Sequence, residues 1–142
     1  MIEMKIDSIR FEYRIEVIRF NPQPVQLDLM FSNAADAAAA IAEISDETVL
    51  IDITQRRNHF CVGDFVLWRT SGRALVRIGE HREHNARQRF TSTVPEGKFD
   101  FRDDVGSAFV VPLADTIDID IANAALMHWL ATGEATDALL WS

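Results

Sequence analysis

The sequence predicts an α+β domain, with a mostly antiparallel β-sheet and two α-helices at about residues 33–44 and 119–132. Three observations lead to this prediction. The N-terminal part alternates apolar and polar residues, which is the period of a half-buried strand. Two separate alanine-rich segments have helical spacing. Several short strand-like segments follow one another between them, so strands do not alternate singly with helices as in α/β proteins.

The length and composition are those of one globular domain that spans residues 1–142. The chain is 48% apolar and 25% charged, and 142 residues are enough to bury a hydrophobic core. No stretch approaches the ~20 apolar residues of a membrane helix. The N-terminal residues alternate charges and lack the apolar core of a secretory signal. We therefore expect a cytoplasmic protein.

The first two strands are predicted at residues 8–17 and 25–31. Apolar side chains take every second position from Ile9 to Val17, and the alternation resumes after a proline-containing turn. We expect the two runs to form an antiparallel pair. The phase changes at Ile18, which indicates a bulge or the end of the strand.

The first helix follows directly. Ser32 or Asn33 is the expected N-cap, and Ala37, Ile41 and Ile44 have the spacing of a buried stripe.

Short strands are predicted through the middle of the chain, at residues 48–54, 60–62, 65–69, 74–78 and 106–112. Gly63-Asp64 is expected to separate the second from the third, and residues 70–73 to form a hairpin turn. Residues 79–89 are polar and lack periodicity, which indicates a loop or the solvent-exposed end of a strand. A further strand is predicted at 89–94 and a loop at 95–104.

The second helix carries the clearest end signals. Asp118 or Asp120 is the expected N-cap, Trp129 lies on the apolar face, and Gly133 follows the last turn. The final apolar run, residues 138–141, is expected to be an edge strand or a docked tail. We expect Trp141 to lock this tail onto the core. The sequence does not decide which face of its strand Trp68 occupies.

No complete catalytic or metal-binding motif is present. His81 and Glu83 match half of the zinc deaminase signature, but its Cys-x-x-Cys half requires more than the single cysteine. His84 lacks the spacing of the His-Glu-x-x-His motif, and neither a Gly-x-Ser-x-Gly elbow nor a phosphate-binding glycine loop occurs. We expect no enzyme activity, no catalytic residues, no cofactor and no metal. A small metal-binding enzyme that uses these residues with His59 and Cys61 remains a less favoured alternative.

Cys61, the only cysteine, allows no intrachain disulfide and suits a reducing compartment. Its apolar neighbours Phe60 and Val62 lead us to expect a small buried side chain.

The net charge of −8 argues against direct binding to nucleic acid or to anionic membranes. It suits a basic protein partner. Residues 101–142 contain one basic and seven acidic residues, so we place the partner-binding site there. The predicted partner-binding residues are Asp103, Asp104, Asp115, Asp118, Asp120, Glu134 and Asp137. The basic stretch 69–89 has two open interpretations: it contacts the partner, or it balances the acidic residues internally.

The C-terminal third resembles a known family. A short strand ending at Pro112 precedes an alanine-rich helix, which ends in Leu-Met-His-Trp-Leu-Ala-Thr-Gly at residues 126–133, and Trp141 follows near the end. This pattern is similar to immunity proteins of bacterial polymorphic toxin systems, in the family usually encoded beside deaminase-type toxins. Glu134-Ala135 stands where that family has Arg-Pro.

The resemblance implies a protein that binds and neutralises a cognate toxin domain, basic and deaminase-like, without catalytic residues of its own. An adaptor or structural protein of a phage or secretion system is the alternative.

Overall fold

The computed structural model describes residues 11–20, 23–58, 60–79, 83–88 and 95–142. Its main sheet has eight strands in the order β10-β6-β5-β4-β3-β1-β2, with β9 beside β5. Its strands are β1 (Phe11–Phe20), β2 (Pro24–Phe31), β3 (Val49–Arg57), β4 (Phe60–Thr70), β5 (Arg73–Gly79), β6 (Glu83–Gln88), β9 (Ile117–Asp118) and β10 (Leu139–Trp141). All of the pairings are antiparallel. The α+β prediction is confirmed.

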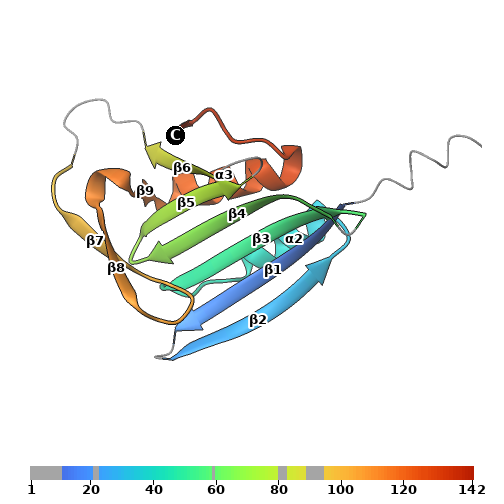
Figure 1. The fold of residues 1–142 in the computed structure, drawn as a ribbon, viewed down its shortest axis with the longest axis horizontal. Coiled ribbons are helices and arrows are strands. Elements are labelled where there is room, and N and C mark those ends of the chain that lie inside the picture. The colour runs from blue at the N-terminus through green and yellow to red at the C-terminus, as the bar shows by residue number, and fades with distance from the viewer. Residues whose placement is uncertain (1–10, 21–22, 59, 80–82, 89–94) are drawn as a thin grey trace, which may run out of the picture.

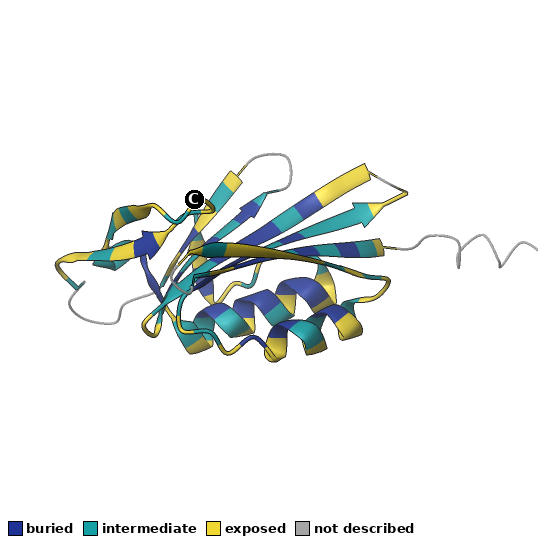
Figure 2. Ribbon diagram, turned by 90° about the horizontal axis from the view of Figure 1, so that it is seen from below, coloured by how far each residue is buried: buried dark blue, intermediate teal, exposed yellow. Residues whose placement is uncertain are grey.

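The two faces of this sheet are covered differently. Helices α2 (Ala34–Ala42) and α3 (Ile119–Thr132) lie side by side on one face (Figures 1 and 2). A separate hairpin of β7 (Lys98–Arg102) and β8 (Ala108–Pro112) lies over part of the other face (Figure 1). We call that second face, away from the helices, the open face. A 3-10 turn, η1 (Leu113–Asp115), links the hairpin to β9 and α3.

The main core fills the space between the sheet and the helices. Ile15, Ile51 and Phe65 project from the strands and are fully buried. Figure 2 shows the buried residues as dark blue bands along the strands and both helices. Trp129 of α3 packs against Phe65 with 5.7 Å between ring centroids. Removing this much apolar surface from water is the main stabilising term of such a domain.

A second, smaller cluster lies on the open face and explains the phase change at Ile18. Strand β1 continues without a register shift to Phe20, so the prediction of a bulge or strand end was wrong. Ile18 packs there with Leu50 and Val66, and Phe20 and Trp68 cover them. Apolar residues appear on both faces of β1 because each face is covered by a different layer.

The helix ends confirm most of the local signals. Asn33 caps α2, since its side chain accepts a hydrogen bond from the Asp36 N–H at 2.8 Å. Gly133 ends α3 with φ of 76°, a left-handed conformation that glycine adopts without steric cost. Asp118 occupies the N-cap position of α3, but its side chain makes no capping bond. Its carboxylate is instead held by residues of the sheet, as described below.

Strands occupy part of the segment 79–89, for which a loop or the exposed end of a strand was expected, and part of the segment 95–104, for which a loop was expected. Residues 83–88 form β6 between β5 and β10, in register with both. Only Ala86 is buried there. The segment therefore lacks the alternation of apolar and polar residues that would predict a strand. Residues 98–102 form β7, in which Phe101 is buried within the hairpin layer. The strand predicted at 89–94 lies outside the described residues.

Strand β4 is continuous, and the break expected at Gly63-Asp64 is a register shift in its pairing with β3. A bulge of this kind absorbs an extra residue without ending the strand. The residues before it lie at an exposed strand end, and Cys61 is exposed there. The expectation that Cys61 is buried was therefore wrong.

Candidate binding surfaces

The seven predicted partner-binding carboxylates lie in three separate places. Asp103 and Asp104 occupy the turn between β7 and β8, and Asp115, Asp118 and Asp120 surround the start of α3. Glu134 and Asp137 follow the other end of this helix, which has 14 residues and is therefore about 20 Å long. The fold does not gather all seven into one patch.

Asp103 has a structural task in its turn. Its Oδ1 accepts hydrogen bonds from the backbone N–H groups of Val105 at 3.1 Å and Ser107 at 2.8 Å. Arg102 closes the same turn by donating to the Gly106 carbonyl at 2.9 Å. Asp104 is exposed beside it and makes no hydrogen bond or ion pair with the part of the chain that the structure describes.

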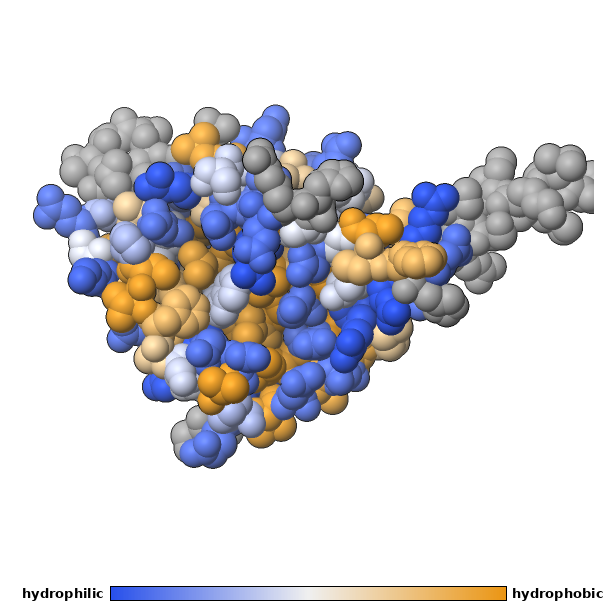
Figure 3. Space-filling model, viewed as in Figure 1, coloured by the Kyte–Doolittle hydropathy of each residue, from blue (hydrophilic) through white to orange (hydrophobic). Residues whose placement is uncertain are grey.

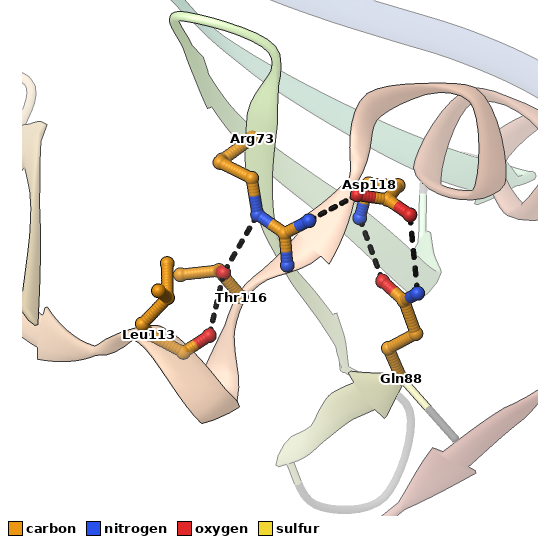
Figure 4. A network of polar contacts seen from close by, with 5 residues as sticks. All are labelled: Arg73, Gln88, Leu113, Thr116 and Asp118. Atoms are coloured by element: carbon orange, nitrogen blue, oxygen red, sulfur yellow. Dashed lines mark hydrogen bonds and ion pairs between the residues drawn. The ribbon is translucent and has the colours of Figure 1, made fainter. Parts of the chain in front are cut away.

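Asp118 is held by two side chains of the sheet (Figure 4). Arg73 of β5 forms an ion pair with its carboxylate. Gln88 of β6 donates to the same carboxylate at 3.1 Å and accepts the Asp118 backbone N–H at 2.9 Å. Arg73 also donates to the Thr116 hydroxyl at 2.9 Å, and that hydroxyl donates to the Leu113 carbonyl at 2.7 Å. This network anchors the start of α3 to the sheet.

Arginines of the basic stretch 69–89 form ion pairs with the chain's own acidic residues. Besides Arg73 with Asp118, Arg87 pairs with Asp115 at 3.1 Å. Arg69 donates to the backbone carbonyls of Ile44 and Asp46 at 2.8 and 3.0 Å. Arg73 and Arg87 therefore balance acidic residues of the chain itself, whereas Arg69 bonds to backbone carbonyls.

The open face carries a row of carboxylates that the sequence did not reveal. Glu16 of β1 lies opposite Asp52 of β3, and Asp64 follows on β4. Figure 3 shows this face, with hydrophilic side chains over the strands and an apolar strip between them and the hairpin. The only signal in the sequence is a lone aspartate inside the apolar run Val49–Ile53.

Burial and like charge both act on Asp52. Its pKa is raised from 3.8 to about 6, first by burial and then by the neighbouring charges of Asp64 and Glu16, while Arg77 and Arg14 oppose the rise. Its Oδ1 is buried and has no hydrogen-bond partner among the described residues. The pKa of Asp64 is also raised by burial, against the opposing effects of Arg77 and the Gly79 N–H.

Trp68 lies on the open face beside this row, which answers the question left by the sequence. The guanidinium carbon of Arg77 is 5.4 Å from its ring centroid, a cation–π contact. Phe109 of the hairpin meets the ring edge-on at 6.2 Å. Trp68 thus attaches the hairpin to the sheet.

The histidine and cysteine candidates do not assemble into a site in the described ranges. Glu83 and His84 are neighbours on β6, and Glu83 faces Arg77 at 3.7 Å. His59 and His81 lie outside the described residues. Within those ranges, no group of three or more His, Cys, Asp or Glu side chains is placed to hold a metal ion.

Two hollows lie away from the carboxylate row. The larger, about 450 Å³, lies where the C-terminal end of α3 meets the ends of β1 and β3, and is lined by residues such as Tyr13, Arg57 and Gly133. Another, about 390 Å³, lies between β8 and the β5–β6 edge, beside Arg87 and Asp115. No helix in the described ranges is long and apolar enough to cross a membrane.

No protein-family model matches this sequence, and no curated protein matches it either.

Proposed function

We propose that this protein is an immunity protein that binds a cognate bacterial toxin domain and neutralises it by protein–protein contact. The proposed toxin is a basic, deaminase-like domain that acts on nucleic acid. One observation carries the proposal: Arg73 and Arg87 are tied to the chain's own carboxylates, whereas Asp104, Asp120 and Glu134 are exposed. Their side-chain carboxylates make no hydrogen bond or ion pair with the described residues, and so are available to a partner.

Exposed carboxylates suit such a target for a physical reason. A cleft that binds nucleic acid contacts phosphates with lysine and arginine, and these contacts supply much of its affinity. Carboxylates presented to the cleft take the place of the phosphates. Opposite charge also raises the association rate, which favours rapid neutralisation of the toxin.

The C-terminal residues that resemble the immunity family have structural roles in this fold, and they position an acidic side chain at the surface. Trp129 is buried, Gly133 ends the helix, and Trp141 donates from Nε1 to the Thr136 carbonyl at 2.7 Å. Glu134 follows Gly133 directly and lies at the rim of a hollow of about 320 Å³ that Trp141 also lines. The pattern residues therefore hold an acidic side chain at the surface.

Co-expression tests the proposal directly. If a toxin with a deaminase-like domain is encoded beside this protein, cells that produce that toxin should survive when this protein is present. Failure to rescue them, with both proteins soluble, would falsify the proposed function.

Association kinetics then test the site. Lysine in place of Asp104, Asp120 and Glu134 together should slow association with the toxin by about tenfold at low salt and reduce its salt dependence. Asp103, Asp115 and Asp118 are left intact because their side chains have internal partners. Glu43→Lys, an exposed position at the end of α2, is the matched control and should change the rate little. Equal effects of the two variants would place the interface elsewhere.

A further inference from the structure

Strand β2 is a long strand at the edge of the described sheet. It pairs with β1 over its full length, from Phe20 opposite Pro24 to Tyr13 opposite Phe31, with no bulge. No described strand pairs with its outer side. The opposite edge of the sheet is β10, which has only three residues. A regular, unpaired edge of this kind is a template for another strand.

This edge also leaves part of an apolar row uncovered. Val25 and Leu27 lie on the helix-bearing face, since Leu27 is opposite the buried Val17. They are 62% and 44% exposed, whereas Leu29 and Phe31 further along pack against the main core. The main core therefore covers only the C-terminal half of β2, which contains Leu29 and Phe31.

We propose that two copies of this chain pair edge to edge through antiparallel β2 strands, about a twofold axis at Leu27. Leu27 then lies opposite Leu27 of the second copy, and Val25 lies opposite Leu29 of the second copy. The exposed apolar residues continue the partly buried row of the other protomer. Both helix layers lie on the same side of the joined sheet.

Side-chain chemistry selects this register. A slip by one residue sends the apolar row to the opposite face. A twofold axis at Asp28 places two carboxylates directly opposite each other, which is destabilising. The axis at Leu27 instead places the Gln26 amide opposite Asp28 of the second copy. The same amide already donates to Asp28 within the strand, at 3.0 Å.

The proposed axis also separates the two acidic hairpin turns. Gly106 of the β7–β8 turn lies against Pro24, since a Cβ added to it would be 3.3 Å from the Pro24 Cδ. In this register, Pro24 lies opposite Met30 of the second copy. The two Pro24 positions are therefore about 20 Å apart along the strands, and repulsion between the turns is small.

Analytical ultracentrifugation of the full chain tests the dimer, and it requires no toxin, so its result is independent of the proposed function. The dimer fraction should rise with protein concentration. Leu27→Lys should weaken dimerisation by at least about tenfold, because it places two like charges in contact. Leu140→Lys is the matched control, since Leu140 is 45% exposed on the opposite edge strand. A monomer at every concentration, or equal weakening by both variants, overturns the proposal.

Disulfide trapping tests the register. In a Cys61→Ser background, Leu27→Cys should form a covalent dimer on mild oxidation, because directly opposite residues have the separation that a disulfide needs. Val25→Cys should not, because the two Val25 positions are about 14 Å apart in this register. Cross-linking of both variants to the same extent, or of neither, contradicts the axis at Leu27.

Discussion

Asp52 lies directly opposite Glu16 on the open face of the sheet, where strands β3 and β1 pair. Both side chains are acidic, and burial together with like charge raises the pKa of Asp52 to about 6. No residue of the described chain satisfies its buried Oδ1. The ionised form of Asp52 therefore destabilises the folded state, and this effect grows as the pH rises.

Asp52→Asn should stabilise the protein at neutral pH. The folded-state pKa exceeds the unfolded value of 3.8, so the folded state binds the proton more tightly, and stability falls as the pH rises through about 6. Asparagine removes that loss. Allowing for partial solvent screening, the gain in unfolding free energy should be about 1 kcal/mol at about pH 7.5 and near zero at about pH 4.

Urea denaturation at the two pH values measures this difference. Asp104→Asn, at an exposed position, is the control and should show no comparable pH dependence. A gain for Asp52→Asn that is the same at both pH values would show that titration of Asp52 is not its cause.

Arg73→Ala should destabilise the start of α3. Arg73 is largely buried, with 19% of its side chain exposed, and it bonds both Thr116 and Asp118. Its loss removes the ion pair with Asp118 and one hydrogen bond to Thr116, although Gln88 and the Leu113 carbonyl still contact these two groups. The unfolding free energy should fall by about 1–3 kcal/mol. Arg57→Ala, at an exposed position, should cost less than about 0.5 kcal/mol in the same urea titration. Equal costs would mean that the network in Figure 4 adds nothing to stability.

Gly79→Ala should strain the open face. A Cβ at Gly79 would overlap the Asp64 carboxylate, which accepts the Gly79 N–H. We expect a loss of about 1–2 kcal/mol in unfolding free energy. In an Asp64→Ala background the same change should cost less, because the overlapping atoms are gone. A double-mutant cycle measures this coupling, and strictly additive effects would locate the strain elsewhere.

Trp141 should stabilise the fold through both its ring and its N–H. Trp141→Phe removes the hydrogen bond to the Thr136 carbonyl and should cost about 1 kcal/mol. Trp141→Ala also removes the contact with the main core, so its cost should be larger, about 2–3 kcal/mol. Leu140→Ala on the exposed side of β10 is the control. Thermal unfolding that is unchanged in Trp141→Ala would mean that the tail is not locked.

The candidate site was only partly predictable, and the reason is physical. The acidity of residues 101–142 is visible in the sequence, but the arginine partners of Asp115 and Asp118 are 28 and 45 residues away in the chain. The row of Glu16, Asp52 and Asp64 exists because three strands pair in one register. No local pattern encodes that juxtaposition.

The sequence by itself determined the α+β class, the helix at 119–132 and its end at Gly133, and it limited the cap of the first helix to Ser32 or Asn33, because these features depend on residues close together in the chain. Tertiary structure alone decided that Asp118 binds Arg73 instead of capping its helix, and that Cys61 is exposed. It also decided that residues 83–88 form a strand and that β2 is the last strand at one edge of the described sheet. These features depend on which distant strands pair and on which face the helices cover.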